Sequence, residues 1–278
     1  MKRIAAVTMV RHDDFFLQKW IEYYGSQVGK ENLYVFFDGT DQEIPGFCKG
    51  INATKVEKIG NTRAGSDKGR INFISEQTKQ LFRQGYELVI GGDADEYLSV
   101  DPAKDKTLAE YLSGLNIKNC CSGLGLDFGQ KLDEEPPLTL ARPFLEQRRF
   151  AQIGTRYTKA SVLVRPLKWG SGFHRVKGRN FHIIPDLYLM HFGYSDIDRI
   201  KGRLSDQSRL SDGWEGHVKK RSRTIRLVNS LKPFPLDMVK KFACRLETIF
   251  RPPYAWNKPA LLGMKIIVEL PSRFRNIL

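Results

Sequence analysis

The sequence predicts an α/β fold built on a doubly wound, mostly parallel sheet. Short apolar runs typical of buried parallel strands alternate with amphipathic helical spacing over about the first 100 residues. The 278 residues are 41% hydrophobic and 27% charged, which are ordinary values for a globular protein. No stretch of the sequence approaches the ~20 continuous apolar residues of a membrane-spanning helix.

The elements can be placed in chain order. Strand 4–10 is apolar and partly β-branched, and the apolar residues of 15–24 recur every three or four positions, which predicts an amphipathic helix. The remaining elements follow the same alternation of strand and helix. They are strand 33–37, strand 56–59, helix 71–82, strand 87–90, and later strands at 161–164 and 187–190.

Positive charge is concentrated at the C-terminal end. Of the formal net charge of +14, residues 194–278 contribute +10, with 18 Lys or Arg against 8 Asp or Glu. Residues 197–231 have a basic, helical pattern, and prolines interrupt the chain beyond residue 231. We therefore expect one domain at 1–195 and a basic helical C-terminal segment at 196–278.

Such a basic segment suits anionic lipid, nucleic acid or an acidic glycan, and charge alone does not select among them. The basic runs 219–223 and 240–241 lie near large apolar side chains such as Phe242, a mixture that favours docking on an anionic membrane. A solvated basic helix face is the alternative. No nucleic acid is expected as a partner, because the basic excess avoids the first 193 positions and no zinc-finger or RNP-like spacing occurs.

The four cysteines are Cys48, Cys120, Cys121 and Cys244. They include one adjacent pair and no CxxC spacing, so neither a zinc site nor a secreted disulfide framework is expected. This pattern fits a cytoplasmic location.

The sharpest chemical signal is the triplet Asp93-Ala94-Asp95, directly after strand 87–90. Carboxylates at i and i+2 of an extended segment point to the same side, so both can face one divalent cation. The glycines at 91–92 allow a diphosphate to approach the backbone. A cation there would neutralise a leaving nucleoside diphosphate. For the triplet alone, a solvated acidic turn is the alternative.

Together with other motifs, this triplet resembles the family 2-related glycosyltransferases, and most closely a bacterial branch related to the family 92 enzymes. The resemblance is good over residues 4–100 and patchy to 200. The matching segments are Val10-Arg11-His12-Asp13-Asp14, 16–17, 20–24, 37–41, 92–97 and Met190-His191-Phe192.

The resemblance implies a GT-A fold, which is Rossmann-like, with a nucleotide-sugar donor, UDP-sugar favoured, and Mg²⁺ or Mn²⁺. It implies that Asp38 contacts the nucleoside and that Asp93 faces the ribose and the metal. It also implies that Asp95 ligates the metal directly and that His191 supplies a third ligand.

Three further residues are candidates for binding the donor or acceptor. Arg70 is similar to an arginine on a helix beside the donor, although an ordinary exposed arginine is the alternative. Arg11 ends the first strand, where the nucleotide is expected. His174 follows Trp169 in a glycine-rich loop and either binds acceptor or diphosphate or packs on that tryptophan.

An inverting transferase needs a carboxylate that takes the proton of the acceptor hydroxyl. Asp127 follows the acidic triplet by about 30 residues, as the base of a family 2 enzyme would. It is the candidate catalytic residue, and Glu96, Glu134 and Glu135 compete with it.

These inferences favour a glycosyltransferase that moves a sugar to a hydroxyl of a glycan or lipid-linked acceptor, with inversion as the family default. Its nucleotide-sugar-binding catalytic domain would be 1–195. By analogy it would serve bacterial surface polysaccharide or lipopolysaccharide synthesis, in the cytoplasm and peripheral on the inner face of the membrane. The alternative is a basic α/β protein that binds nucleic acid or anionic membrane without catalysis.

Overall fold

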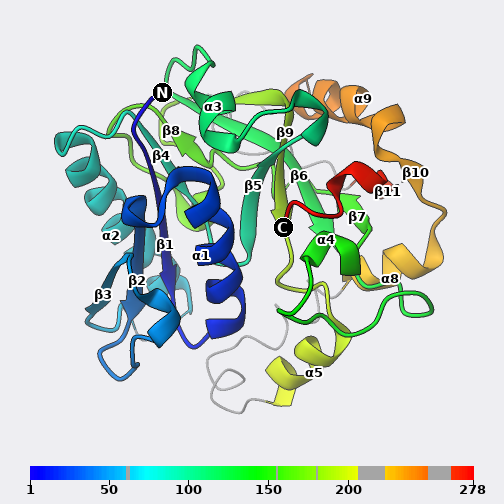
Figure 1. The fold of residues 1–278 in the computed structure, drawn as a ribbon, viewed down its shortest axis with the longest axis horizontal. Coiled ribbons are helices and arrows are strands. Elements are labelled where there is room, and N and C mark those ends of the chain that lie inside the picture. The colour runs from blue at the N-terminus through cyan, green and yellow to red at the C-terminus, as the bar shows by residue number, and fades with distance from the viewer. Residues whose placement is uncertain (61–62, 155, 180, 206–222, 250–263) are drawn as a thin grey trace.

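In the part of the chain that the structure describes, the centre of the molecule is a mixed sheet of eleven strands with helices on both faces (Figure 1). The computed structural model describes residues 1–60, 63–154, 156–179, 181–205, 223–249 and 264–278. Within these ranges, no helix is both long and apolar enough to cross a bilayer.

The N-terminal half of the sheet is parallel. Its order is β3-β2-β1-β4, where β1 is Ile4–Val10, β2 is Leu33–Asp38, β3 is Asn52–Val56 and β4 is Leu88–Gly91. Successive side chains of β1 enter different cores. Ala6 packs in the core that contains helix α1 (Asp14–Val28), and Val7 in the core that contains helix α2 (Arg63–Arg83). The predicted α/β class with a doubly wound arrangement is confirmed.

The other half of the sheet mixes parallel and antiparallel pairs. Its strands are β5 (Glu96–Val100), β6 (Cys120–Phe128), β7 (Phe150–Ile153), β8 (Val162–Leu163) and β9 (His182–His191). Strand β8 lies antiparallel between β4 and β6, β9 is parallel to β6, and β5 is antiparallel to β9. Three short helices connect this half, namely α3 (Leu108–Ser113), α4 (Phe144–Gln147) and α5 (Ile197–Ser205).

The C-terminal segment contributes to the same sheet. Its described elements are α8 (Arg223–Ser230), β10 (Phe234–Pro235), α9 (Leu236–Ile249) and β11 (Ile267–Glu269). Strand β11 pairs with β7, and β10 pairs with β11. The sequence predicted a wholly helical segment, and this was wrong, because β11 and β10 extend the sheet beyond β7. The domain boundary at 195/196 stays a prediction, and most of the basic run 219–223 lies outside the described residues.

Two elements have boundaries that differ from those predicted from the sequence. The strand expected at 56–59 is β3, which ends at Val56, and the helix expected from residue 71 already begins at Arg63. Residues 63–70 are small or polar and carry no apolar periodicity, so their helical state was not visible in the sequence. The four cysteines are free thiols, and Cys48, Cys120 and Cys121 are buried.

An ionic cluster around Asp101 ties the C-terminal segment to the sheet. The Asp101 carboxylate, buried at the end of β5, accepts hydrogen bonds from Arg273 Nε at 2.7 Å and Nη2 at 2.9 Å. Lys240 of α9 donates to Asp101 at 3.1 Å and to Asp186 of β9 at 2.9 Å. Burial alone would raise the pKa of Asp101, but Arg273, the Ala103 amide and Lys240 outweigh it and hold this pKa well below its usual range.

We expect Asp101→Asn to lower the free energy of unfolding by about 3 kcal/mol at pH 7, because it leaves buried donors with a neutral partner. A carboxyl group whose pKa is lower in the folded state than in the unfolded state stabilises the fold at pH values above the unfolded pKa of about 3.9. This stabilisation is lost as the pH falls. The difference between wild type and variant should therefore shrink below about pH 4, which urea unfolding at pH 7 and at pH 3.5 would measure.

Asp198→Asn is the matched control, because its pair with Lys201 is exposed, with 61% and 69% of the two side chains accessible. We expect it to change stability by no more than about 0.5 kcal/mol. A loss in Asp101→Asn that does not vary with pH would contradict the ionic assignment.

Candidate metal and nucleotide site

The carboxyl ends of β1 and β2 bring together three of the residues predicted to bind the donor. Arg11 follows β1, Asp38 ends β2, and Arg70 of α2 reaches the same edge by donating to the Met9 carbonyl at 2.6 Å. Ligands of open α/β sheets bind at such an edge.

Each of these side chains is held by specific contacts. Arg11 donates to the Asp38 carbonyl and makes a bidentate pair with Asp41, at 2.9 and 2.8 Å. This arginine lowers the pKa of Asp41 to about 2 through its hydrogen bonds. The buried Asp38 carboxylate accepts a hydrogen bond from the Ile59 backbone amide at 2.8 Å. The structure brings Arg11, Asp38 and Arg70 together, and their roles toward a nucleotide stay predictions.

The acidic triplet lies in a turn between β4 and β5. The Glu96 amide donates to the Asp93 carbonyl at 3.0 Å, which closes a four-residue turn from Asp93 to Glu96. The premise of an extended segment was therefore wrong, although the two carboxylates still come within reach of one cation. The chain turns here because β5 does not continue beside β1 and β8, the strands that pair with β4. It pairs with β9 instead, with Glu96 opposite His191.

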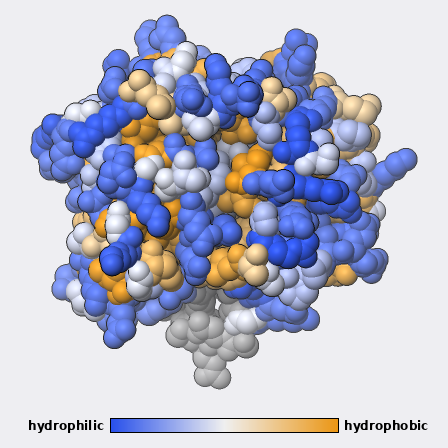
Figure 2. Space-filling view, viewed as in Figure 1, coloured by the Kyte–Doolittle hydropathy of each residue, from blue (hydrophilic) through white to orange (hydrophobic). Residues whose placement is uncertain are grey.

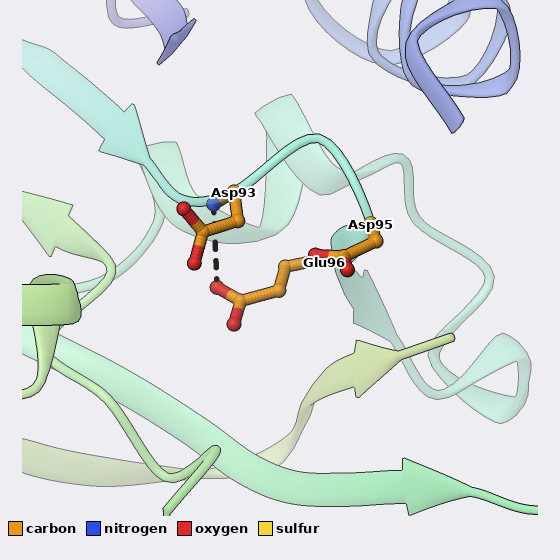
Figure 3. A group of neighbouring side chains, drawn as sticks. All are labelled: Asp93, Asp95 and Glu96. Atoms are coloured by element: carbon orange, nitrogen blue, oxygen red, sulfur yellow. Dashed lines mark hydrogen bonds between the residues drawn. The ribbon is translucent and has the colours of Figure 1, made fainter. Parts of the chain in front are cut away.

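The turn nevertheless gathers three carboxylates. Figure 3 shows Asp93 after β4, with Asp95 and Glu96 at the start of β5 and the Glu96 carboxylate directed toward the Asp93 amide, 3.4 Å away. One oxygen from each carboxylate lies within 4.8 Å of the others, a grouping that could hold a metal ion. The Asp93 side chain is 40% exposed and Glu96 is buried, so the cluster is reached from the Asp93 side.

A lysine side chain contacts this acidic cluster. Lys159, 3% exposed, pairs with the buried Glu96 carboxylate and lies 3.5 Å from Asp93 Oδ2. Burial acts to lower the pKa of Lys159, but Glu96, Asp93 and Asp95 outweigh it and raise the pKa, so this group is a cation. Burial raises the pKa of Glu96 to about 7, against the lowering effect of Lys159.

His191 approaches the cluster from the end of β9. Its Nε2 lies 3.6 Å from Asp95 Oδ2, and its Nδ1 is hydrogen-bonded to Asp127 Oδ1 at 2.7 Å. Burial acts to lower the pKa of His191, but Asp95 and Asp127 outweigh it and raise it to about 9. A carboxylate on one ring nitrogen fixes the orientation of a histidine whose other nitrogen faces a metal, and the residues present fit that arrangement.

Asp127, the predicted base, is occupied by other groups. Its Oδ1 is hydrogen-bonded to His191, and its Oδ2 accepts a hydrogen bond from the hydroxyl of Thr224 in α8 at 2.5 Å. The competing carboxylates are also engaged: Glu96 by Lys159, Glu134 by Arg149, and Glu135 by the amides of residues 131 and 149. Its contacts give Asp127 an orienting role, and the base role stays a prediction.

His174 lies on a loop beside the acidic turn. Trp169 and Phe173 of this loop pack against Gly91, where an added Cβ would lie 2.9 Å from the tryptophan ring atom Cζ2 and 3.1 Å from the phenylalanine. Trp169 and His174 therefore belong to a loop that covers the end of β4. A contact of His174 with donor or acceptor stays a prediction.

Two glycines allow the close packing around His191. At Gly193, an added Cβ would overlap Asp95 Oδ2 and lie 2.9 Å from His191 Nε2. At Gly125 of β6, it would overlap the backbone of the segment that carries Tyr157, whose ring stacks on His191 at 3.9 Å between centroids. Both positions therefore need a residue without a side chain.

Sequence reasoning missed Lys159 and Thr224. Lys159 lies in an irregular segment beyond residue 100, and Thr224 belongs to the tail that was expected to be an appendage. Their partners are 63 and 97 residues away in the chain, so no local pattern marks either contact. Glu96 was named only as a competing base, although its place beside Asp95 was a signal for a third carboxylate.

No family model and no curated protein matches this chain. Among solved structures it is similar to a putative nucleotide-diphospho-sugar transferase from Desulfovibrio desulfuricans, at 10% identity and a TM-score of 0.29 over 46% of this chain and 61% of that one. It is also similar to mannose-1-phosphate geranyltransferase from Thermus thermophilus, at 11% identity and a TM-score of 0.30 over 96% of this chain and 74% of that one. At these TM-scores neither likeness carries an argument about this chain.

We expect Gly193→Ala to weaken Mn²⁺ binding about 10- to 100-fold, because the new methyl group pushes Asp95 and His191 apart. Electron paramagnetic resonance of free Mn²⁺ would measure the affinity, and circular dichroism would confirm the fold. Gly46→Ala is the matched control, since an added Cβ there meets nothing within 4 Å. Equal affinity in wild type and Gly193→Ala would show that the ion is not held by Asp95 and His191.

Proposed function

We propose that this protein is a metal-dependent glycosyltransferase of GT-A type that transfers a sugar from a nucleotide sugar to an acceptor hydroxyl. One observation carries the proposal: three carboxylates and a carboxylate-oriented histidine converge where β4, β5 and β9 meet. The strand ends beside them carry Arg11 and Asp38.

The donor would lie across the ends of β1, β2 and β4. Asp38, already oriented by the Ile59 amide, would face the nucleoside. Arg11 and Arg70 would supply positive charge toward the phosphates, as a guanidinium pairs well with such oxygens. We favour a uridine nucleotide on the strength of the family 2 resemblance, with the family 92-related branch as its finer placement.

Asp93 and Asp95 would hold Mg²⁺ or Mn²⁺, with His191 as a third ligand. When bound, the ion neutralises the charge that develops on the departing diphosphate. Glu96 contributes differently, since Lys159 already pairs with it. Lys159 would balance the negative charge of the cluster and keep the buried Glu96 carboxylate compatible with the fold.

In the transfer itself, the bond between the anomeric carbon and the diphosphate oxygen breaks while the acceptor oxygen bonds to that carbon. Inversion, with a carboxylate receiving the acceptor proton, remains the family default. We further propose a glycan or lipid-linked acceptor and a role in bacterial surface polysaccharide or lipopolysaccharide synthesis at the cytoplasmic side of the membrane.

A donor-hydrolysis screen tests the proposal. Purified protein is incubated with UDP, GDP, CMP and dTDP sugars, with and without Mn²⁺, and the released nucleotide is measured. We expect one donor class to be hydrolysed only with the ion, and Asp95→Asn to reduce that rate at least about 100-fold. Asp198→Asn, on exposed α5, should leave the rate unchanged. No release from any donor, or full activity in Asp95→Asn, would refute the proposal.

Asp127→Asn separates the two roles of Asp127. If the residue orients His191, the variant should bind Mn²⁺ about 10- to 100-fold more weakly, because the amide no longer fixes the ring. If it is the base, turnover should collapse while Mn²⁺ affinity stays at the wild-type value. The contacts with His191 and Thr224 favour the first result.

A further inference from the structure

Helix α9 turns an apolar face to solvent. Met238, Phe242 and Ile249 are 73%, 57% and 65% exposed. Their spacing of four and seven residues puts them on one stripe of the helix, and Arg245 falls on the same stripe. Scattered exposed apolar residues need no explanation, but a row of large ones on one helix face marks an interaction surface.

The rotation of α9 is fixed by its other face. Leu236, Ala243 and Glu247 are buried against the body of the protein. Lys240, on the same side, is anchored by Asp186 at 2.9 Å and by Asp101 at 3.1 Å. The apolar row is therefore held outward by the fold.

Basic residues accompany the apolar row. Lys241 and Arg245 are exposed on α9. The two acidic residues of the helix do not offset them there, because Asp237 is paired with Arg273 and Glu247 is buried. In Figure 2, pale apolar surface borders polar surface where α9 lies in Figure 1.

We propose that this face of α9 docks on an anionic lipid surface. Met238, Phe242 and Ile249 enter the interfacial region, and Lys241 and Arg245 meet the lipid phosphates. This inference does not depend on the proposed transferase activity. It also narrows the membrane contact predicted from the basic tail, which already included residues 240–241 and Phe242, to one face of a helix whose orientation is defined.

The charge of the row favours anionic lipid as its occupant. Lys241 and Arg245 are exposed beside Met238, Phe242 and Ile249, and this combination of cations with large apolar side chains suits an anionic interface. A lipid interface needs only a few inserted side chains supported by cations.

Docking through α9 leaves the candidate site open. Lys240 contacts Asp186, which lies roughly 15 Å along β9 from His191. Figure 1 shows α9 at the upper right, whereas α5, which follows the end of β9, lies at the bottom. The acidic cluster therefore lies toward the other end of β9 from the residues that anchor α9.

Co-sedimentation with vesicles tests the proposal. We expect the full chain to pellet with vesicles of three parts phosphatidylcholine to one part phosphatidylglycerol, to stay in solution with phosphatidylcholine alone, and to dissociate as salt is raised. Absence of binding to the anionic vesicles would overturn the proposal.

Variants locate the contact. Each cation near an anionic surface strengthens binding roughly fivefold, so Lys241→Gln with Arg245→Gln should weaken partitioning about 25-fold. Met238→Ser with Phe242→Ser should weaken it at least about tenfold. The control double variant is Ile44→Ser with Leu132→Ser, at positions 40% and 50% exposed, which should bind like wild type.

Two outcomes would contradict the assignment to α9. One is an equal loss of vesicle binding in the Ile44 and Leu132 control. The other is a dimer in size-exclusion chromatography that Phe242→Ser dissociates, because that result would assign the row to a second copy of the chain.

Discussion

The constraint on which the candidate site depends is the crowding of three carboxylates into one turn. Oxygens of Asp93, Asp95 and Glu96 lie within 4.8 Å of one another, and Glu96 is buried. Like charges at this separation repel, and a buried carboxylate loses its hydration, so compensating positive charge stabilises the turn. Lys159 supplies that charge on one side of the cluster, and on the other side it comes from a protonated His191 or from a cation that a neutral His191 would help to bind.

Both compensating groups come from distant parts of the chain. Lys159 is brought in by the segment before β8, where the Gly91 amide donates to the Ser161 carbonyl at 2.8 Å. His191 arrives because β9 pairs with β5 directly after the turn. The acidic turn and its cations are therefore assembled by sheet pairing, and the site is formed only when both halves of the sheet are in register.

The sequence allowed the parallel half of the sheet and the location of the acidic cluster to be predicted. Apolar runs mark β1, β2 and β4, because strands buried on both faces are continuously hydrophobic. The nearness of His191 to Asp95 came from a family resemblance. What could not be predicted was the turn geometry and the contact of Lys159, since these follow from a change of pairing partner between β4 and β5 and from contacts across 63 residues.

The tail shows most clearly why local patterns were insufficient. Its charge suggested a separate basic appendage, yet Thr224 holds the second oxygen of Asp127 and Arg273 holds Asp101 at the far end of β5. The contact of Thr224 orients Asp127, which in turn orients His191. The contact of Arg273 anchors β5, the strand that begins with Glu96. Residues beyond 195 thus help to orient His191 and to anchor β5, which begins at the acidic turn. Charge concentrated in one segment of sequence therefore says little about whether that segment folds independently of the site.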